Sequence, residues 1–366
     1  MPNNYKTIFV HGIYTVNVGD DLFLRMLASR YPTTKMVMYA PERYKQFLGC
    51  YSNCIVYSDS DASIRRLLVI SKIFHLPASL LIYIFLFVKH RILLFLIIGG
   101  SLFIEGNSHV PSLLNGLKKL RILFPKLKIA IMGSNFGPCI TTDWKRQVLQ
   151  SLSVCDDVCF RDKPSFDEFS SLATVRWGND IVMHLTPQIA FTKKKRVSIN
   201  IRSVDNWNTL KPYKTQYLAN TKKIIECFIQ GGYSIYLLSF CEKYGDSIIT
   251  EDLYNSIENK GVVKKCFYRG NIEEIMEIIA TSEYIIGTRF HAIVLGLTFG
   301  LKVLPISYSI KTENMLKTLG IWRDVYEYAS YCSTDVSELL DSFVDGFVID
   351  SENNKQFDYL DKILCS

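Results

Sequence analysis

The sequence predicts an α/β protein built from two doubly wound, Rossmann-like domains that face a cleft. Two observations carry this prediction. Short apolar segments with the composition of buried strands alternate with helical segments along nearly the whole chain. Continuous apolar strands of this kind are typical of parallel sheets that are covered by helices on both faces. The chain of 366 residues is also long enough for about two domains.

In the first half of the chain, strands are expected at residues 7–12, 35–40, 54–58, 92–100, 128–133 and 157–162. In the second half, strands are expected at residues 196–202, 234–240, 264–270, 283–289 and 302–308, separated by helices near 213–230, 246–259, 271–281 and 290–299. The composition changes at "AFTKKKRVSINIR", where a basic run precedes a new apolar strand. We therefore expect domains at 1–191 and 192–366, the second ending in C-terminal helices.

Composition and charge exclude some classes of function. The chain is 48% hydrophobic and 21% charged, which is typical of a protein with a large core. Its net charge of +7 comes without a long basic block containing aromatic residues, so we expect anionic ligands or a membrane surface and no nucleic acid. The ten cysteines are scattered without a CxxC pair. We therefore expect no metal site, and reduced thiols in a cytoplasmic protein.

One segment of the first domain, residues 73–98, is unusually apolar. Its run from Leu76 to Val88 is too short to span a bilayer, since a spanning helix needs about 20 apolar residues. Two interpretations stay open. The segment is a core helix followed by a buried strand. Alternatively, it is a membrane-facing patch on the cytoplasmic leaflet, where anionic headgroups would meet the neighbouring basic residues Arg65, Arg66, Lys72, Lys89, His90 and Arg91.

In doubly wound sheets, ligands bind where strands end and helices begin. In the most informative loop of this kind, the strand ends at Gly287, Thr288 is expected to cap the next helix, and Arg289 and His291 fall in its first turn. A cation beside the positive end of a helix is unfavourable unless the two hold an anion together. His291 is a candidate general acid or base. A structural Arg beside a partly buried His would give the same local pattern.

Two further loops of the second domain place cations at the same edge of the predicted sheet. Arg202 ends one strand, and Tyr308 and Lys311 lie where another strand gives way to a helix. Each cation alone is compatible with an ordinary surface residue. Together with Arg289, these residues predict a pocket for a small ligand with more than one negative charge.

Small and polar residues also follow the strands of the first domain. Helix capping by Asn17 and Asp20 would explain the stretch "NVGDD", because such residues accept hydrogen bonds from the first turn. Glycines after two later strands allow the backbone to approach a ligand closely. We expect Arg161 and Asp162 to form an internal structural pair. The candidate ligand-binding residues of this domain are Asn17, Gly19, Asp20, Gly99, Gly100, Ser101 and Asn135.

With these motifs in view, the chain resembles the polysaccharide pyruvyltransferase family. That family shows an N-x-G-D motif, a glycine-rich loop followed by Ser, an R-D-x-x-S element, an R-x-H near the start of a late helix, and a Tyr shortly before a Lys. The matching residues here are Asn17, Gly19 and Asp20, then Gly99, Gly100 and Ser101, then Arg161, Asp162 and Ser165, then Arg289 and His291, and finally Tyr308 and Lys311. One departure is Ile98, where the family often has a third glycine.

The resemblance implies a two-domain fold of the GT-B kind and a transferase without metal or cofactor. Phosphoenolpyruvate would be the donor, and a sugar of a cell-surface polysaccharide or its lipid-linked precursor the acceptor. Pyruvate would become a ketal across two hydroxyls as phosphate leaves. The second domain would hold the donor through Arg202, Gly287, Thr288, Arg289, Tyr308 and Lys311, with His291, Arg289 and Lys311 catalytic. The first domain would bind the acceptor through the candidate residues named for it, in the cytoplasm and in peripheral contact with the inner leaflet.

Two other functions are compatible with the sequence. A glycosyltransferase of the GT-B kind that uses a nucleotide sugar would need an acidic residue for the ribose, and Glu283 and Glu313 are available. A non-catalytic polysaccharide-assembly protein could retain the same fold, since fold does not fix function. The intact Arg289, His291 and Lys311 speak against the non-catalytic alternative.

Overall fold

The structure, a computed structural model, describes residues 6–106, 110–185, 191–321, 326–346 and 353–365. The chain divides into two compact units. The first unit comprises Met1–Tyr14, Phe23–Ile181 and Glu352–Ser366, and the second comprises Thr15–Leu22 and Val182–Ser351. Each unit is therefore assembled from separate stretches of chain.

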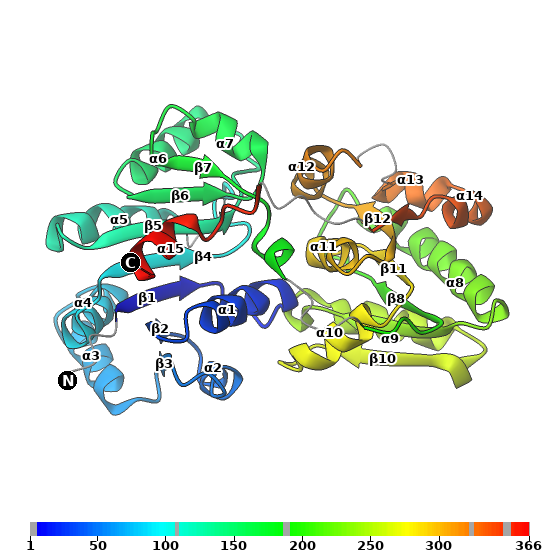
Figure 1. Ribbon diagram of the computed structural model, residues 1–366, viewed down its shortest axis with the longest axis horizontal. Helices are drawn as coiled ribbons and strands as arrows, with labels where there is room; N and C mark the ends of the chain where they lie inside the picture. Colours follow the sequence, from blue (N-terminus) through cyan, green and yellow to red (C-terminus); the bar gives the residue numbers. More distant parts are fainter. Residues whose placement is uncertain (1–5, 107–109, 186–190, 322–325, 347–352, 366) are drawn as a thin grey trace. The chain divides into compact units, whose positions relative to one another are not determined.

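The first unit is built on a parallel sheet with the strand order β3-β2-β1-β4-β5-β6-β7 (Figure 1). The chain builds outward from β1 in one direction and then from β4 in the other, which is the order of a doubly wound fold. The strands are β1 (Thr7–Gly12), β2 (Lys35–Tyr39), β3 (Cys54–Tyr57), β4 (Leu94–Ile98), β5 (Lys128–Ser134), β6 (Asp157–Phe160) and β7 (Val175–Trp177).

Both faces of this first sheet are buried. Phe9 and Phe95 belong to a core cluster on one face, and their neighbours Ile8 and Leu94 are fully buried as well. Because successive side chains of a strand point to opposite faces, this burial requires helices on both sides. The helices are α1 (Val18–Arg30), α2 (Arg43–Phe47), α3 (Ala62–Ile73), α4 (Ala78–His90), α5 (Val110–Leu123), α6 (Thr142–Leu152), α7 (Lys163–Phe169) and α15 (Asp358–Leu364).

The second unit repeats this architecture with the order β10-β9-β8-β11-β12-β13, and β14 pairs antiparallel with β12. Its strands are β8 (Arg196–Asn200), β9 (Ser234–Ser239), β10 (Val263–Phe267), β11 (Tyr284–Gly287), β12 (Lys302–Ser307), β13 (Tyr326–Glu327) and β14 (Val344–Asp345). Its helices are α8 (Lys214–Gln230), α9 (Asp246–Ser256), α10 (Ile272–Ala280), α11 (Phe290–Thr298), α12 (Ile310–Thr318), α13 (Tyr328–Ser333) and α14 (Val336–Asp341). Short 3-10 turns occur at η1 (Ile181–His184), η2 (Lys211–Tyr213), η3 (Glu242–Tyr244) and η4 (Lys260–Val262).

These two parallel sheets confirm the predicted fold class, and each strand expected from an apolar segment is present. The short strands β7, β13 and β14 were not expected, because they have two or three residues and no long apolar run. The division into units differs from the expected boundary at 191/192, since it passes between Ile181 and Val182. The chain end also returns to the first unit, where Asp361 of α15 accepts hydrogen bonds from Arg30 and Tyr31.

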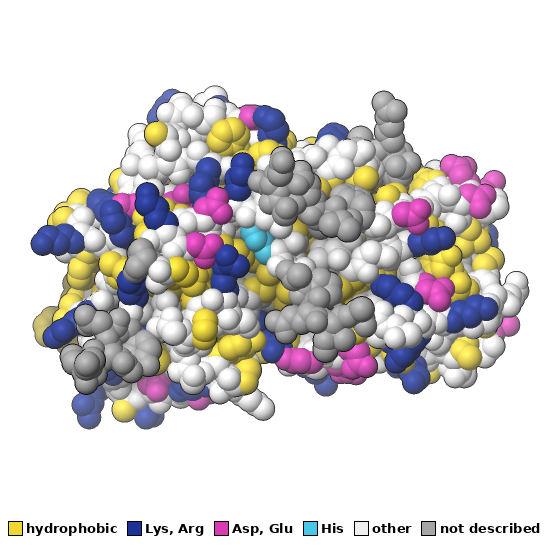
Figure 2. Space-filling model, viewed as in Figure 1, with side chains coloured by type: hydrophobic (Ala, Val, Ile, Leu, Met, Phe, Trp, Pro, Cys, Tyr) yellow, Lys and Arg dark blue, Asp and Glu magenta, His cyan; other side chains and the backbone are white. Residues whose placement is uncertain are grey.

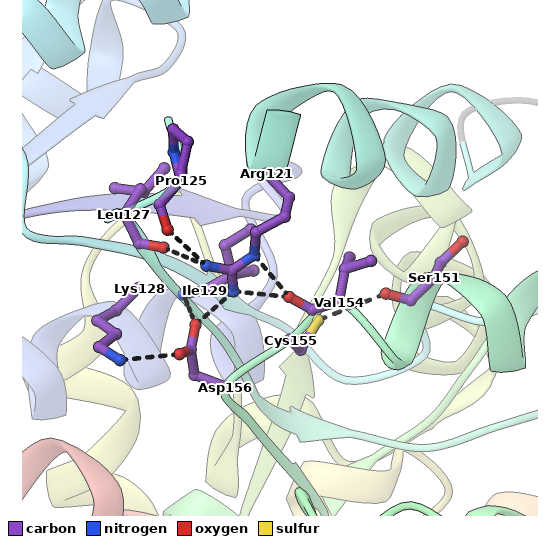
Figure 3. Close-up of polar contacts among 9 residues, drawn as sticks. All are labelled: Arg121, Pro125, Leu127, Lys128, Ile129, Ser151, Val154, Cys155 and Asp156. Atoms are coloured by element: carbon purple, nitrogen blue, oxygen red, sulfur yellow. Dashed lines mark hydrogen bonds and ion pairs between the residues drawn. The ribbon is translucent and has the colours of Figure 1, made fainter. Parts of the chain in front are cut away.

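The amino edge of the first sheet shows how this protein satisfies a partly buried cation (Figure 3). Arg121 of α5 donates to the carbonyl of Leu127 at 2.9 Å and to that of Val154 at 2.7 Å. Its Nη2 also lies 2.5 Å from Oδ2 of Asp156, whose other oxygen lies 3.0 Å from Nζ of Lys128. Burial alone would raise the pKa of Asp156, but Arg121 is the main group that lowers it. This edge is therefore a closed structural network.

The apolar segment 73–98 is mostly core. Helix α4 buries Ile82, Leu86 and Phe87, and β4 is buried throughout. The structure therefore agrees with a core helix followed by a buried strand for most of this segment. The exposed apolar side chains gather just before α4, around the turn that leaves α3. Within the described ranges, no helix is both long and apolar enough to cross a membrane.

Candidate functional site

The predicted donor residues meet at the carboxyl edge of the second sheet. Strands β8, β11 and β12 are adjacent and parallel, so the loops that follow them share one edge. Arg202 follows β8, Arg289 follows β11, and Tyr308 follows β12. The point between β8 and β11 is where the strand order reverses, and this is the usual ligand position in doubly wound sheets.

Arg289 is held by a carboxylate from the same unit. Its Nε lies 2.9 Å from Oδ2 of Asp246, and its Nη2 lies 2.5 Å from Oδ1. The Asp246 side chain is fully buried. Burial alone would lower the pKa of Arg289, but the charge of Asp246 raises it. The sequence predicted an anion beside Arg289. The carboxylate of Asp246 is such an anion, and it belongs to the protein itself.

Arg289 directly precedes α11 and occupies the N-cap position that we had expected for Thr288, so His291 lies in the first turn of the helix and Arg289 does not. Its backbone N–H donates to Oδ1 of Asn200 at 3.0 Å. Asn200 in turn donates to the carbonyl of Leu238, so one buried amide joins three neighbouring strands. The Thr288 hydroxyl lies 2.6 Å from the hydroxyl of Tyr217, so the Thr288 side chain forms a hydrogen bond with a residue of α8.

Gly287 has a packing reason to be glycine. A Cβ at this position would lie 2.9 Å from Cγ1 of Ile293, so the first turn of α11 sits directly on the end of β11. A real side chain contact is essentially never that short. Gly287 therefore fixes the position of the α11 start, and with it the positions of Arg289 and His291.

Arg202 is a buried cation that has no ion-pair partner among the described residues. Its residue is 8% exposed, and none of the residues that the structure describes gives it a hydrogen bond or an ion pair. Instead its guanidinium carbon lies 3.9 Å from the ring centre of Tyr308 and 5.0 Å from that of Trp207. Burial lowers the pKa of Arg202, and the like charge of Arg289 lowers it further, while Tyr308 and the more distant carboxylate of Asp246 raise it in part. A buried cation of this kind is costly unless an anion joins it.

Tyr308 is surrounded by the three predicted cations. Burial alone would raise its pKa, but the charges of Lys311, Arg202 and Arg289, together with a hydrogen bond to Lys311, lower it to about 8. Lys311 lies in the first turn of α12, with its Nζ 5.8 Å from the Tyr308 ring centre. The arrangement is a positively charged site at the edge of one sheet, with an acidic phenol at its centre.

His291 is packed against residues Thr15–Leu22, which comprise a short loop and the start of α1 and belong to the second unit. A Cβ on Gly19 would lie 1.8 Å from Nδ1 of His291. Only glycine fits there while the ring keeps its place. Val18 N–H donates to the carbonyl of Phe240 at 3.3 Å, and the Tyr268 hydroxyl donates to Asp21 at 2.9 Å, so the loop is fastened on both sides.

The polar residues of this loop have separate parts. The Oδ1 atom of Asn17 accepts a hydrogen bond from the N–H of Gly19 at 3.1 Å, which is the capping geometry that we expected for the start of α1. Burial raises the pKa of Tyr244, and the charge of Asp20 raises it further. Tyr244 also stacks with Arg289, whose guanidinium carbon is 5.3 Å from its ring centre. The charge of Asp20 therefore acts on Tyr244, whose ring lies beside the Arg289 guanidinium.

The remaining acceptor candidates form a second cluster, in the first unit. Oδ1 of Asn135 accepts from the Ser101 hydroxyl at 3.2 Å and from Nη2 of Arg161 at 2.8 Å. A Cβ on Gly100 would lie 3.1 Å from the Arg161 guanidinium, and one on Gly99 would lie 3.0 Å from Ile13. The glycines thus let the loop after β4 lie against Arg161.

One expectation about this cluster was wrong. Arg161 does not pair with Asp162: its Nη1 lies 3.0 Å from Oδ2 of Asp180, and both side chains are buried. Asp162 instead caps α7 by accepting from the N–H of Ser165 at 2.8 Å. Burial raises the pKa of Asp162, and the charge of Arg161 lowers it in part, so the two residues interact through charge without an ion pair.

The acceptor candidates are therefore divided between the two units. Asn17, Gly19 and Asp20 lie with the donor candidates, and the loop residues from Gly99 to Ser101 lie with Asn135 in the first unit. Sequence reasoning missed Asp246, Asp180 and the Trp207 ring beside Arg202, none of which follows an apolar strand directly. One usable signal was Asn200, a polar residue at the carboxyl end of β8.

The two acids considered for a nucleotide ribose lie at different edges of the second sheet. Glu283 precedes β11, so it lies at the amino edge of the sheet, and its carboxylate accepts from the Tyr233 hydroxyl. Glu313 lies in the first turn of α12, 3.8 Å from Lys317. Among the described residues, no group of three or more His, Cys, Asp or Glu could hold a metal ion.

Solved structures share this fold at low sequence identity. UDP-GlcNAc 2-epimerase from Neisseria meningitidis matches with a TM-score of 0.60 and 10% identity over 99% of this chain and 100% of that chain. The corresponding epimerase from Methanocaldococcus jannaschii matches at 0.58 and 10% identity over 99% of both chains. HepE from Anabaena, in complex with UDP and glucose, matches at 0.52 and 12% identity over 99% and 100%. The class is thus a two-domain α/β protein with the GT-B kind of fold.

Sequence comparison identifies the family. The family model for polysaccharide pyruvyl transferase matches residues 17–310. The chain belongs to that family, which confirms the resemblance seen in its motifs. It is also 26% identical to the amylovoran biosynthesis protein AmsJ of Erwinia amylovora over 169 residues, which is 44% of this chain and 38% of AmsJ.

Proposed function

We propose that this protein is a pyruvyltransferase that moves pyruvate from phosphoenolpyruvate to a sugar of a cell-surface polysaccharide or of its lipid-linked precursor. Membership of the polysaccharide pyruvyl transferase family supports the reaction class. The single observation that supports an anionic donor is Arg202, a buried guanidinium beside Lys311 and Tyr308 without a counter-charge among the described residues. Phosphoenolpyruvate carries both a carboxylate and a phosphate, and so suits a site with several cations.

In the proposed reaction, one acceptor hydroxyl adds to C2 of the enol while a proton goes to C3, which becomes a methyl group. The bond between C2 and the phosphate oxygen then breaks, and a second hydroxyl closes the ketal. Of the two hydroxyl protons, one is balanced by the proton gained at C3 and the other leaves with phosphate. His291 is our choice for the proton transfers, because it lies in the first turn of α11 beside Arg289.

The three cations take different parts in this proposal. Arg202 and Lys311 would contact the donor directly. Arg289 would act with Asp246 as a fixed dipole that orients the site and adds positive potential. Tyr308 would donate a hydrogen bond to an anionic oxygen while it is protonated. Asn17, Gly19 and Asp20 would place the His291 ring, and the cluster of Ser101 and Asn135 would bind the sugar. No metal or cofactor enters this reaction.

Thermal unfolding tests the donor. Phosphoenolpyruvate, inorganic phosphate and UDP-sugars would each be added to the wild type and to Arg202→Met. A ligand present at about 100 times its dissociation constant should stabilise the fold by about 2.7 kcal/mol. We expect phosphoenolpyruvate to stabilise the wild type and not Arg202→Met. The matched control is Arg196→Met, at the amino end of β8, the strand that Arg202 follows; the guanidinium carbon of Arg196 lies 4.2 Å from the ring centre of Tyr236.

A result in which only UDP-sugars stabilise the protein would contradict the proposed donor and favour a glycosyltransferase. The similarity to UDP-GlcNAc 2-epimerases and to HepE is a similarity of fold, so it does not by itself indicate which donor this protein uses. Turnover would be followed as phosphate released in the presence of a lipid-linked oligosaccharide. Such an acceptor would place the enzyme in the cytoplasm, at the inner leaflet of the membrane.

A further inference from the structure

The first unit carries an exposed apolar corner where helix α3 turns into α4. Its members are Val69, Ile70, Ile73, Phe74 and Leu76, with exposed fractions from 41% to 66%. Large apolar side chains that are exposed singly need no explanation, but a contiguous group indicates an interaction surface. We call this group the α3–α4 corner.

The corner is held in place by its own turn. The Ser71 hydroxyl donates to the carbonyl of Leu76 at 2.6 Å, and Leu76 N–H donates to the carbonyl of Ser71 at 3.0 Å. His75 between them has a φ of 51°, the left-handed conformation that reverses the chain. Behind the corner, Ile64 is buried and Leu67 and Leu68 pack on the core. The exposed side chains are therefore presented by a fixed turn on an anchored helix.

The sequence of α3 aligns cations with this corner. Arg65 precedes Val69 by one helical turn, and Arg66 precedes Ile70 in the same way, so cations and apolar side chains share one face. Both arginines are exposed, as is Lys72. The chain contains no Asp or Glu between Asp61 and Glu105. Elsewhere, on the face drawn in Figure 2, Lys and Arg side chains lie among Asp and Glu side chains.

We propose that the α3–α4 corner docks on an anionic lipid surface, with Phe74, Ile73 and Leu76 entering the headgroup boundary and Arg65, Arg66 and Lys72 facing lipid phosphates. Apolar tips with a basic rim are the composition that binds anionic membranes peripherally. The charges also argue against a second copy as the occupant. In a two-fold interface the same patch meets itself, so these cations would face one another without acidic partners.

This inference rests on the proposed function in one respect: a lipid-linked acceptor would explain why the enzyme binds a membrane. The structure also moves the surface that the sequence suggested. The run from Leu76 to Val88 lies mainly in α4, which packs on the core, and the exposed side chains precede it. Docking through the corner would require no spanning helix.

Vesicle sedimentation tests the inference with the full chain, without donor or acceptor. Vesicles of phosphatidylcholine alone would be compared with vesicles that also contain phosphatidylglycerol. We expect binding only to the anionic vesicles, and weaker binding at high salt. Phe74→Asp should weaken binding at least tenfold, and Arg65→Gln and Arg66→Gln by about fivefold each. The matched controls are Ile140→Asp, at a position 90% exposed in the same unit, and the exposed Lys126→Gln.

The outcomes separate the alternatives. The inference would be overturned if the wild-type protein did not bind anionic vesicles. It would also be overturned if the Phe74→Asp and Ile140→Asp variants bound them equally well. Light scattering after gel filtration gives the second readout. A wild-type dimer that Phe74→Asp converts to a monomer, without vesicle binding, would assign the corner to a second copy. Since donor binding is measured separately, failure of the docking surface and failure of the proposed donor are distinguishable.

Discussion

Two buried arginines, one in each unit, differ in how their charge is satisfied. Arg161 of the first unit donates to Asp180 and to Asn135, and its side chain is 2% exposed. Arg202 of the second unit is also buried, but its guanidinium lies against the rings of Trp207 and Tyr308 and not against a carboxylate. A buried pair is tolerated because the partners offset each other's desolvation, whereas a buried lone cation lowers stability. We infer that Arg161 stabilises the fold and that Arg202 binds an anionic ligand.

The largest effect should come from breaking the satisfied arginine. Arg161→Met would remove the guanidinium that pairs with the buried Asp180, and we expect breaking this pair to lower the free energy of unfolding by about 3–5 kcal/mol. Urea unfolding measures it. The control Arg146→Met breaks an ion pair with Asp143 whose side chains are 67% and 74% exposed, and should change little. Equal effects of the two variants would show that Arg161 has no special structural part.

The opposite result is expected for the unsatisfied arginine. Arg202→Met should leave the free energy of unfolding of the free protein unchanged or higher, because a lone buried charge is removed. It should abolish the stabilisation of about 2.7 kcal/mol that saturating phosphoenolpyruvate gives the wild type. Thermal unfolding with and without the donor measures both quantities. A variant that is strongly destabilised without ligand would contradict the comparison.

A third prediction compares the glycines that face the two clusters. Gly19→Ala would drive a methyl group to 1.8 Å from the His291 ring, so the ring or the loop must move. We expect about 1–3 kcal/mol of destabilisation and a larger loss of phosphate release. Gly100→Ala meets the Arg161 guanidinium at 3.1 Å, a milder contact, and should cost less. Circular dichroism melts and a turnover assay measure the two variants side by side.

The smallest effect concerns pH. Lys311, Arg202 and Arg289 lower the pKa of Tyr308 to about 8 against the effect of burial. Above that pH the phenolate adds a negative charge beside the cations, so affinity for phosphoenolpyruvate should fall by up to about tenfold between pH 7 and pH 9. Isothermal titration across this range measures it. Tyr308→Phe should remove the fall, and an equal fall in that variant would assign the titration to another group.

Much of the fold was predictable because its strands are continuous apolar runs, such as "LFLII" of β4. The meeting of Arg202, Arg289 and Tyr308 was predictable as well, since parallel strands share a carboxyl edge. The partners of these residues were not. Asp246 is the first residue of α9 and Asp180 lies in a loop, and only tertiary packing brings these two carboxylates to the arginines. The short strands β7 and β13 depend on their neighbours in the sheet more than on their own composition.

The route of the chain limits how proteins of this kind could exchange parts. The second unit includes Thr15–Leu22, and the first unit includes Glu352–Ser366. A gene cut at residue 191 would therefore give an amino-terminal fragment without α15 and a carboxyl-terminal fragment without the glycine that faces His291. Recombination at that midpoint would separate the proposed donor site from residues 15–22. Inheritance of a working site should thus follow the whole gene rather than either half.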